Sequence, residues 1–144
     1  MVEPPGDRIL VTGALGQIGT ELVSELRKKH GNDTVLATDI REPNDDRYFP
    51  EGPFCNLSVL DGEAMEKTVT GEGIGTVYHL AAILSATGEK NPELCHRVNV
   101  GGTVTVLDVA RDFGLKVFAP SSIAVFGPDS PKVAPQKATL NPST

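Results

Sequence analysis

The sequence predicts an α/β protein with a Rossmann-type, doubly wound parallel sheet that stops after about five strands. Three observations predict it. Apolar strand-like segments alternate with helical segments along the 144 residues, a glycine-rich turn follows the first strand, and an acidic residue closes the second. Strand–helix–strand alternation favours right-handed crossovers and the strand order 3-2-1-4-5. We therefore expect a ligand site between the first and fourth strands, beyond their carboxyl ends.

The individual elements follow from the spacing of apolar residues. Residues 8–12 (RILVT) form an apolar, β-branched run that is typical of a strand buried on both faces. Ile18, Leu22 and Leu26 recur every fourth residue and predict a helix with one apolar stripe, whose C-terminal cations favour the helix dipole. The expected strands cover 8–12, 34–39, 54–59, 76–81 and 116–121, and the expected helices cover 17–30, 61–70 and 91–113.

Capping residues and helix breakers set several boundaries. Asp61 is a plausible N-cap, and Asn91 followed by Pro92 is a strong helix start. Gly101 and Gly102 interrupt the last helix at a cost of roughly 1 kcal/mol each, which suggests close packing there against a strand or a ligand. From Gly127 onward, four prolines are expected to keep the chain extended.

Residues 12–19 (TGALGQIG) fit the pattern GxxGxxG between a strand and a helix, which is the context in which this pattern binds a dinucleotide. Gly13 allows the tight turn, Gly16 removes a Cβ that would hold a diphosphate away, and Gly19 lets the helix pack on the sheet. N–H groups near Gln17 and Ile18, together with the helix dipole, would stabilise the phosphates. A glycine-rich turn without a ligand is the alternative.

Asp39 ends the second expected strand, 20 residues after Gly19. A carboxylate at this place accepts hydrogen bonds from a ribose diol and repels a 2′-phosphate, so NAD is favoured over NADP as the cofactor. Arg41, two residues on, softens that preference. An acid at a strand end is otherwise often only a solvated cap.

Composition excludes several classes of protein. The net charge is −6 and no basic stripe is present, which argues against a nucleic-acid partner. The longest apolar stretch, around 76–84, is far shorter than the roughly 20 residues of a membrane span. Cys55 and Cys95 lack a metal-ligand spacing, so we expect free thiols in a reducing compartment and no metal. A cytoplasmic protein is expected, or a mitochondrial matrix protein whose presequence was removed.

The glycine pattern together with residues 78–82 (YHLAA), Asn99 and the Ser121–Ser122 pair resembles the extended short-chain dehydrogenase/reductase (NAD-dependent epimerase/dehydratase) family. Within it, residues 84–89 (LSATGE) and 120–128 (PSSIAVFGP) look like those of the L-threonine 3-dehydrogenases. The similarity runs from about residue 7 to residue 144. It implies that 1–144 is an incomplete NAD(P)-binding domain, without the catalytic helix and the substrate lobe.

The resemblance also implies roles for individual residues. It assigns catalysis to Ser122 and Asn99, and substrate contacts to Ser85, Ser122 and Thr144. The family typically has Asp where Ser58 stands, so adenine recognition is expected to be weaker. Tyr78 and His79 lie in an apolar strand and are expected in the core. The implied cofactor-binding residues are Gly13, Gly16, Gln17, Ile18, Gly19, Asp39, Ile40, Arg41, Ser58, Val59, Leu80, Ala81, Ala82 and Ser121.

The implied activity is NAD-dependent oxidation of L-threonine to 2-amino-3-oxobutanoate by the parent protein, expected to be a homodimer. The family uses a Tyr-xxx-Lys pair as its proton acceptor, and Tyr48 and Tyr78 stand in the wrong places to replace that tyrosine. The chain alone is therefore expected to be inactive. Two alternatives remain: a nucleotide-sugar epimerase or dehydratase, and a non-catalytic NAD-binding fragment.

Overall fold

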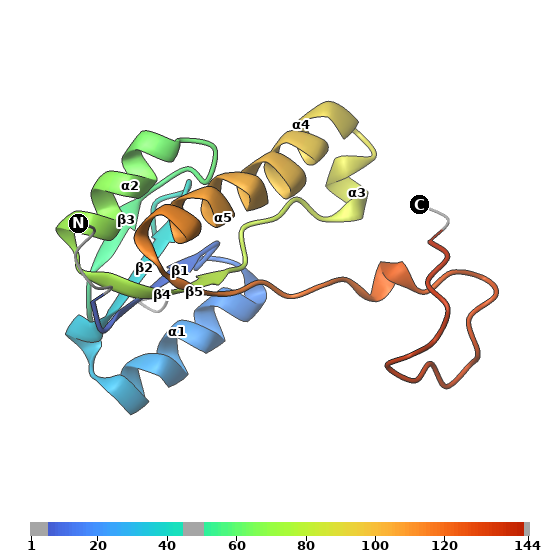
Figure 1. Cartoon of the computed structure of the whole chain (residues 1–144), viewed down its shortest axis with the longest axis horizontal. Coiled ribbons are helices and arrows are strands. Elements are labelled where there is room, and N and C mark those ends of the chain that lie inside the picture. Colours follow the sequence, from blue (N-terminus) through green and yellow to red (C-terminus); the bar gives the residue numbers. More distant parts are fainter. Residues whose placement is uncertain (1–5, 45–50, 143–144) are drawn as a thin grey trace.

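The computed structural model describes residues 6–44 and 51–142, and its centre is a five-stranded parallel sheet (Figure 1). The strand order is β3-β2-β1-β4-β5, as predicted. The order reverses between β1 and β4, so the crevice at their carboxyl ends is the place where such a sheet binds ligands. The strands are β1 (Arg8–Thr12), β2 (Val35–Asp39), β3 (Phe54–Asn56), β4 (Ile74–His79) and β5 (Lys116–Phe118).

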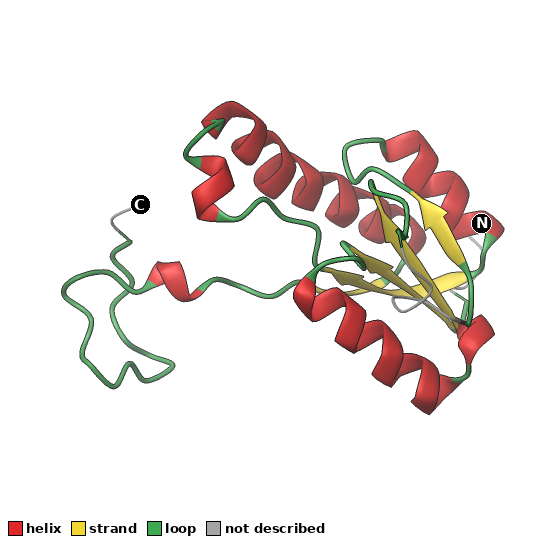
Figure 2. Ribbon diagram, turned by 180° about the vertical axis from the view of Figure 1, so that it is seen from behind, coloured by secondary structure: helices red, strands yellow, loops and turns green. Residues whose placement is uncertain are grey.

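Helices cover both faces of the sheet (Figure 2). Helix α1 (Gln17–His30) lies on one face, and α2 (Gly62–Gly71) and α5 (Gly102–Phe113) lie on the other. Along β1, Leu10 packs with the core beside α2 and α5, whereas Val11 packs with the core beside α1. Both faces of the strand are thus buried, which explains its unbroken apolar sequence.

Three strands differ from the prediction by two residues or more, while β2 begins one residue later than predicted. β4 begins two residues earlier than expected, because Ile74 already pairs with Arg8 of β1. It also ends two residues earlier, where the N–H groups of Leu80 and Ala81 donate to the Thr12 hydroxyl at the end of β1. β3 ends at Asn56, since a turn that leads into α2 starts at Ser58, whose carbonyl accepts from the Asp61 N–H. β5, an edge strand, ends at Phe118, two residues before Pro120, which has no N–H to donate to the sheet.

The predicted apolar stripe of α1 is rotated. Ile18 is 67% exposed, and the buried side of the helix consists of Gly19, Val23, Leu26 and Arg27. The helix turns this side to the sheet because Gly19 sits directly against the main chain of the preceding turn. Arg27 does not merely complement the helix dipole, as the sequence predicted, but is buried.

Residues 92–113 form a continuous helical stretch, after Asn91 as N-cap, with an unpredicted change of pitch. After α4 (Pro92–His96), a π-helical turn covers Arg97–Gly101 and leads into α5. A Cβ on Gly102 would lie 2.6 Å from Cγ2 of Val59, so the predicted close packing is real, although the neighbour is a loop and not a strand. The short helix α3 (Ser85–Gly88) was also not predicted.

The segment after β5 leaves the body of the molecule (Figure 1). It contains a 3₁₀ turn at Ile123–Val125, and beyond it the chain is not extended as predicted. The Ser130 N–H donates to the Gly127 carbonyl, and the Asn141 side chain donates to Asp129 at 3.0 Å. The prolines therefore sit in a loop that closes on itself, because proline also favours turns.

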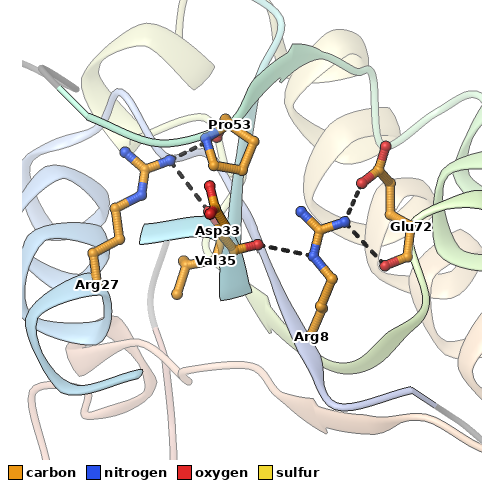
Figure 3. Close-up of polar contacts among 6 residues, drawn as sticks. All are labelled: Arg8, Arg27, Asp33, Val35, Pro53 and Glu72. Atoms are coloured by element: carbon orange, nitrogen blue, oxygen red, sulfur yellow. Dashed lines mark hydrogen bonds and ion pairs between the residues drawn. The ribbon is translucent and has the colours of Figure 1, made fainter. Parts of the chain in front are cut away.

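Two arginines join the amino ends of the strands (Figure 3). Arg8 donates to the Asp33 and Glu72 carbonyls and pairs with the Glu72 carboxylate. Arg27 donates to the carbonyls of Glu51, Val35 and Pro53 at 2.8, 3.2 and 2.6 Å. These contacts fix the end of the sheet opposite to the predicted ligand site.

Candidate functional site

The turn between β1 and α1 has a backbone that only glycine fits. Gly13 has a φ of 66°, and a Cβ there would lie 2.7 Å from the Ala81 nitrogen. A Cβ on Gly19 would lie 2.4 Å from the Gly13 carbonyl oxygen. The turn is closed by the Gly16 N–H, which donates to the Gly13 carbonyl at 3.0 Å. The predicted steric reason for Gly13, a tight turn, is thus present in the structure. Gly19 is required by its contact with the main chain of the turn, not with the sheet as predicted.

The first turn of α1 presents unused donors. Gly16 is the N-cap residue and provides no side-chain acceptor, and the first turn contains no acidic residue. The first intrahelical hydrogen bond is that of the Thr20 N–H, so Gln17 and Ile18 have main-chain N–H groups without intrahelical partners. A Cβ on Gly16 would meet only the Gly13 carbonyl oxygen within 4 Å. This end of the helix thus has the open approach and the donors that bind phosphate.

Asp39 faces this turn. Its Oδ2 accepts from the Leu15 N–H at 3.0 Å, and its side chain is 5% exposed. Arg41 also donates to the carboxylate, through its main-chain N–H and its guanidinium. Burial raises the pKa of the Asp39 carboxyl, but hydrogen bonds from Arg41 and Leu15 outweigh burial and hold the pKa below its usual value. The carboxylate is therefore ionised at neutral pH, beside the donors of the turn.

A chain of hydrogen bonds links the end of β1 to the last helix. The Thr103 hydroxyl donates to the Asn99 carbonyl at 2.7 Å, so its oxygen accepts from His79 Nε2 at 3.2 Å. His79 Nδ1 is then an acceptor for the Thr12 hydroxyl at 2.9 Å. The network assigns a neutral, Nε2-protonated imidazole. Burial also lowers the pKa of His79, which agrees with its predicted place in the core.

The buried imidazole predicts a pH-dependent stability. The folded-state pKa of His79 lies below the ordinary value of 6.5, so the unfolded chain binds more protons once the pH falls below that value. The relevant pH range lies between the lowered pKa of folded His79 and its ordinary value of 6.5. The free energy of unfolding should be at its full value above this range and decrease as the pH falls through it. We expect His79→Gln to be less stable than the wild type at neutral pH. Its free energy of unfolding should depend less on pH in this range, as measured by urea unfolding at several pH values. The exposed His96, changed to Gln, is the control that keeps the wild-type slope.

Asn99 holds the loop that follows β4. Its Oδ1 accepts from the Ile83 N–H at 2.7 Å, and its Nδ2 donates to the Ile83 carbonyl at 2.9 Å. The residue lies in the π-helical turn, a feature that often marks functional positions in helices. Both ends of its amide are thus used to position the main chain between Leu80 and Ser85.

The other predicted cofactor residues surround the same edge of the sheet. Ile40 follows Asp39 and is 69% exposed. Ser58 accepts from the Leu60 N–H, and Val59 is buried against Gly102, so the Val59 side chain belongs to the core. Past β4, Leu80 and Ala81 are half-buried beside Gly13, and Ala82 is exposed.

The predicted catalytic and substrate residues are less closely assembled. Ser85 begins α3 and is exposed. Ser121 and Ser122 are exposed in the segment that leaves the body, where the Ser122 hydroxyl accepts from the Ala124 N–H at 3.1 Å. Within the described ranges, no hydrogen bond joins Ser122 to Asn99 or to the glycine turn. Thr144, like Tyr48, lies outside the described residues.

Sequence reasoning missed the Thr12–His79–Thr103 chain, although a signal for it existed. Thr12 and His79 are polar residues at the ends of apolar strands, and the register places them opposite each other. A polar side chain in a buried strand needs a partner. Pairing neighbouring strand ends would have suggested this contact.

Comparison with known proteins assigns the family. Residues 9–144 match the NAD dependent epimerase/dehydratase family. The chain belongs to this family. An uncharacterized epimerase/dehydratase of Staphylococcus haemolyticus is 50% identical over 139 residues, covering 96% of this chain and 44% of that protein. The chain thus spans less than half the length of this relative.

Solved structures of family members have the same fold. A monomeric L-threonine 3-dehydrogenase from a metagenome is 54% identical with a TM-score of 0.86, over 94% of this chain and 43% of that one. The L-threonine dehydrogenase of Clostridium difficile is 36% identical with a TM-score of 0.90, over 98% and 44%. In the described part of this family member, no helix has the length and apolar character needed to cross a bilayer.

Proposed function

We propose that this chain binds NAD, and that the protein to which it belongs oxidises the 3-hydroxyl of L-threonine to give 2-amino-3-oxobutanoate. The observation that supports the cofactor proposal is the hydrogen bond from the Leu15 N–H to Asp39, which brings this carboxylate next to the glycine turn whose N–H groups we propose as phosphate donors. The bound cofactor would supply the acceptor for the hydride of the alcohol carbon.

The residues have distinct proposed roles. The main chain of Gln17 and Ile18 donates to the diphosphate, and Asp39 accepts from the adenosine ribose. Leu80, Ala81 and Ala82 border the path to the nicotinamide. Asn99 acts through the Ile83 main chain and thereby positions this loop. The remaining proposed contacts are Gly13, Gly16, Gly19, Ile40, Arg41, Ser58, Val59 and Ser121 with the cofactor, Ser85 and Thr144 with the substrate, and Ser122 with the reacting hydroxyl.

Threonine is favoured over a nucleotide sugar by the likeness to threonine dehydrogenases. One of these structures shares 54% identity with the chain, whereas an epimerase of Methanothermobacter thermautotrophicus shares 28% with a TM-score of 0.80. Residues 84–89 and 120–128 carry the resemblance within the chain. A nucleotide-sugar epimerase or dehydratase is the second candidate, because the curated relatives carry that broader name.

The cofactor proposal is tested by calorimetric titration of the chain with NAD and NADP. We expect NAD to bind more tightly than NADP, because the Asp39 carboxylate repels a 2′-phosphate. Asp39→Asn should weaken NAD binding by about tenfold, since a charged acceptor makes the stronger hydrogen bonds. The same substitution should also reduce the ratio of the affinity for NAD to the affinity for NADP. Asp33→Asn, in the 3₁₀ turn just before the start of β2, is the matched control, and an equal effect of both changes would refute the assignment.

The substrate proposal is tested on a protein of the relatives' full length that contains this chain. We expect NADH formation with L-threonine, followed by absorbance. We also expect no conversion of UDP-glucose, followed by chromatography of the nucleotide sugar, because an epimerase or dehydratase regenerates its NAD and releases no NADH. Ser122→Ala should lower kcat by about 100-fold, the usual range for a residue of the proton-transfer system. Ser121→Ala should change kcat much less. Activity with UDP-glucose alone would establish the second candidate instead.

A further inference from the structure

The Asp39 carboxylate is saturated by donors of its own chain. Oδ1 accepts from the N–H and the Nε of Arg41, at 3.1 and 3.0 Å. Oδ2 accepts from the Leu15 N–H at 3.0 Å and from Nη2 of Arg41 at 3.2 Å. An ionised carboxylate offers about four lone-pair positions. A ribose hydroxyl therefore has no acceptor position left on Asp39 in this arrangement.

Two of these four donors are fixed and two are movable. The N–H groups of Leu15 and Arg41 belong to the main chain at the glycine turn and at the end of β2. The guanidinium belongs to a side chain that is 61% exposed, while that of Asp39 is 5% exposed. The guanidinium can leave toward solvent, whereas the carboxylate cannot. The positions it would vacate, one on each oxygen, equal in number the two hydroxyls of a ribose diol.

We propose that Arg41 competes with the nucleotide ribose for Asp39, so that its guanidinium has to leave the carboxylate when NAD binds. This inference rests on the proposed NAD-binding function. The ion pair keeps a buried charge hydrogen-bonded before the nucleotide arrives, and the ribose then takes over that task. The competition weakens NAD binding by about three- to tenfold, the range expected for a partly exposed arginine–carboxylate pair.

The displaced guanidinium should affect the two nucleotides differently: it weakens the binding of NAD but favours the binding of NADP. Arg41 remains two residues from Asp39, next to the place where the 2′-oxygen of the ribose would lie. A guanidinium there attracts a 2′-phosphate. Removing it should therefore strengthen the binding of NAD and weaken the binding of NADP, a divergence that a purely structural role would not produce.

The test compares Arg41→Gln, Arg41→Lys and the wild-type chain by calorimetric titration with NAD and NADP, and by thermal unfolding with and without NAD. We expect Arg41→Gln to unfold at a lower temperature without nucleotide, to bind NAD about three- to tenfold more tightly, and to bind NADP more weakly. Arg41→Lys should lie between, because an ammonium group lacks the planar fork that reaches both oxygens. Arg111→Gln, which removes an arginine paired with Asp108 and Asp112 on α5, is the matched control.

Each outcome decides the proposal. Equal or weaker NAD binding by Arg41→Gln overturns it while leaving the proposed cofactor intact, because the wild-type titration is measured independently. Absence of NAD binding by the wild-type chain overturns both the competition by Arg41 and the proposed NAD-binding function. If circular dichroism finds Arg41→Gln unfolded, Arg41→Lys decides, and affinity no higher than that of the wild type counts against the competition. A gain of NADP affinity in either variant contradicts the proposed position of the guanidinium.

Discussion

Gly13→Ala should abolish NAD binding and lower the free energy of unfolding by about 2–5 kcal/mol. Two separate physical effects add at this position. The φ of 66° is unfavourable for any residue with a Cβ, and the new methyl group would lie 2.7 Å from the nitrogen and 2.8 Å from the Cα of Ala81. Because these neighbours are main-chain atoms, they cannot move aside without shifting the loop after β4. The loss is measured by urea unfolding and by titration with NAD.

Gly114→Ala separates the two effects. Gly114 has a φ of 69° at the end of α5, but a Cβ there would meet nothing within 4 Å. Its substitution should therefore cost only the backbone term, about 1 kcal/mol, and leave NAD affinity unchanged. Equal losses in the two variants would mean that the contact with Ala81 contributes nothing, and that the glycine turn is not held against the loop as the structure has it.

Much of this site could be predicted because it depends on short stretches of chain. The turn around Gly13, the helix start at Gln17 and the acid at Asp39 each follow from local sequence and from the order of elements. Asp61 as an N-cap was predictable for the same reason, and its side chain accepts from the Ala64 N–H at 3.0 Å.

What could not be predicted depends on contacts between distant segments. The sequence gives no measure of how far α1 rotates about its axis, so Ile18 was placed on the buried stripe although it is exposed. The two hydrogen bonds between Asn99 and Ile83 are made from within the π-helical turn, and no local sequence pattern predicts this turn. The self-closing loop after Gly127 likewise depends on a contact from Asn141 back to Asp129, 12 residues away.

The saturation of Asp39 illustrates a different limit. The sequence predicts the type of the residue and its place at the end of β2, but not how many of its acceptor positions are already used. The main-chain N–H groups of Leu15 and Arg41 use two of these positions, and the rotamer of the exposed Arg41 side chain decides whether the other two are used. A carboxylate that marks a cofactor site in the sequence is therefore not the same as a carboxylate that is ready to bind.

The second large effect is expected at Arg27, at the end of the sheet away from the site. Its side chain is buried and donates to the carbonyls of Glu51, Val35 and Pro53, which belong to the segment before β3 and to the start of β2. Figure 3 shows the contacts with Val35 and Pro53. Arg27→Met fills a similar space but provides no donor. We expect the free energy of unfolding to fall by about 3 kcal/mol, because three hydrogen bonds from a charged donor at a largely buried position are lost.

The affinity of folded Arg27→Met for NAD should remain within about twofold of the wild type, since coupling between distant, separately packed sites is small. Lys28→Met, the neighbouring exposed residue that pairs only with Glu25 among the described side chains, is the control and should unfold as the wild type does. Urea unfolding measures the first effect and titration the second. A large loss of NAD affinity in Arg27→Met would contradict this expectation. It would show that the contacts of Arg27 at the amino ends of the strands determine the position of Asp39 at the other end of β2. Preserved NAD affinity together with reduced stability would establish separate roles for the two ends of the sheet. The end at Arg27 would provide stability, and the end at the glycine turn would bind the nucleotide.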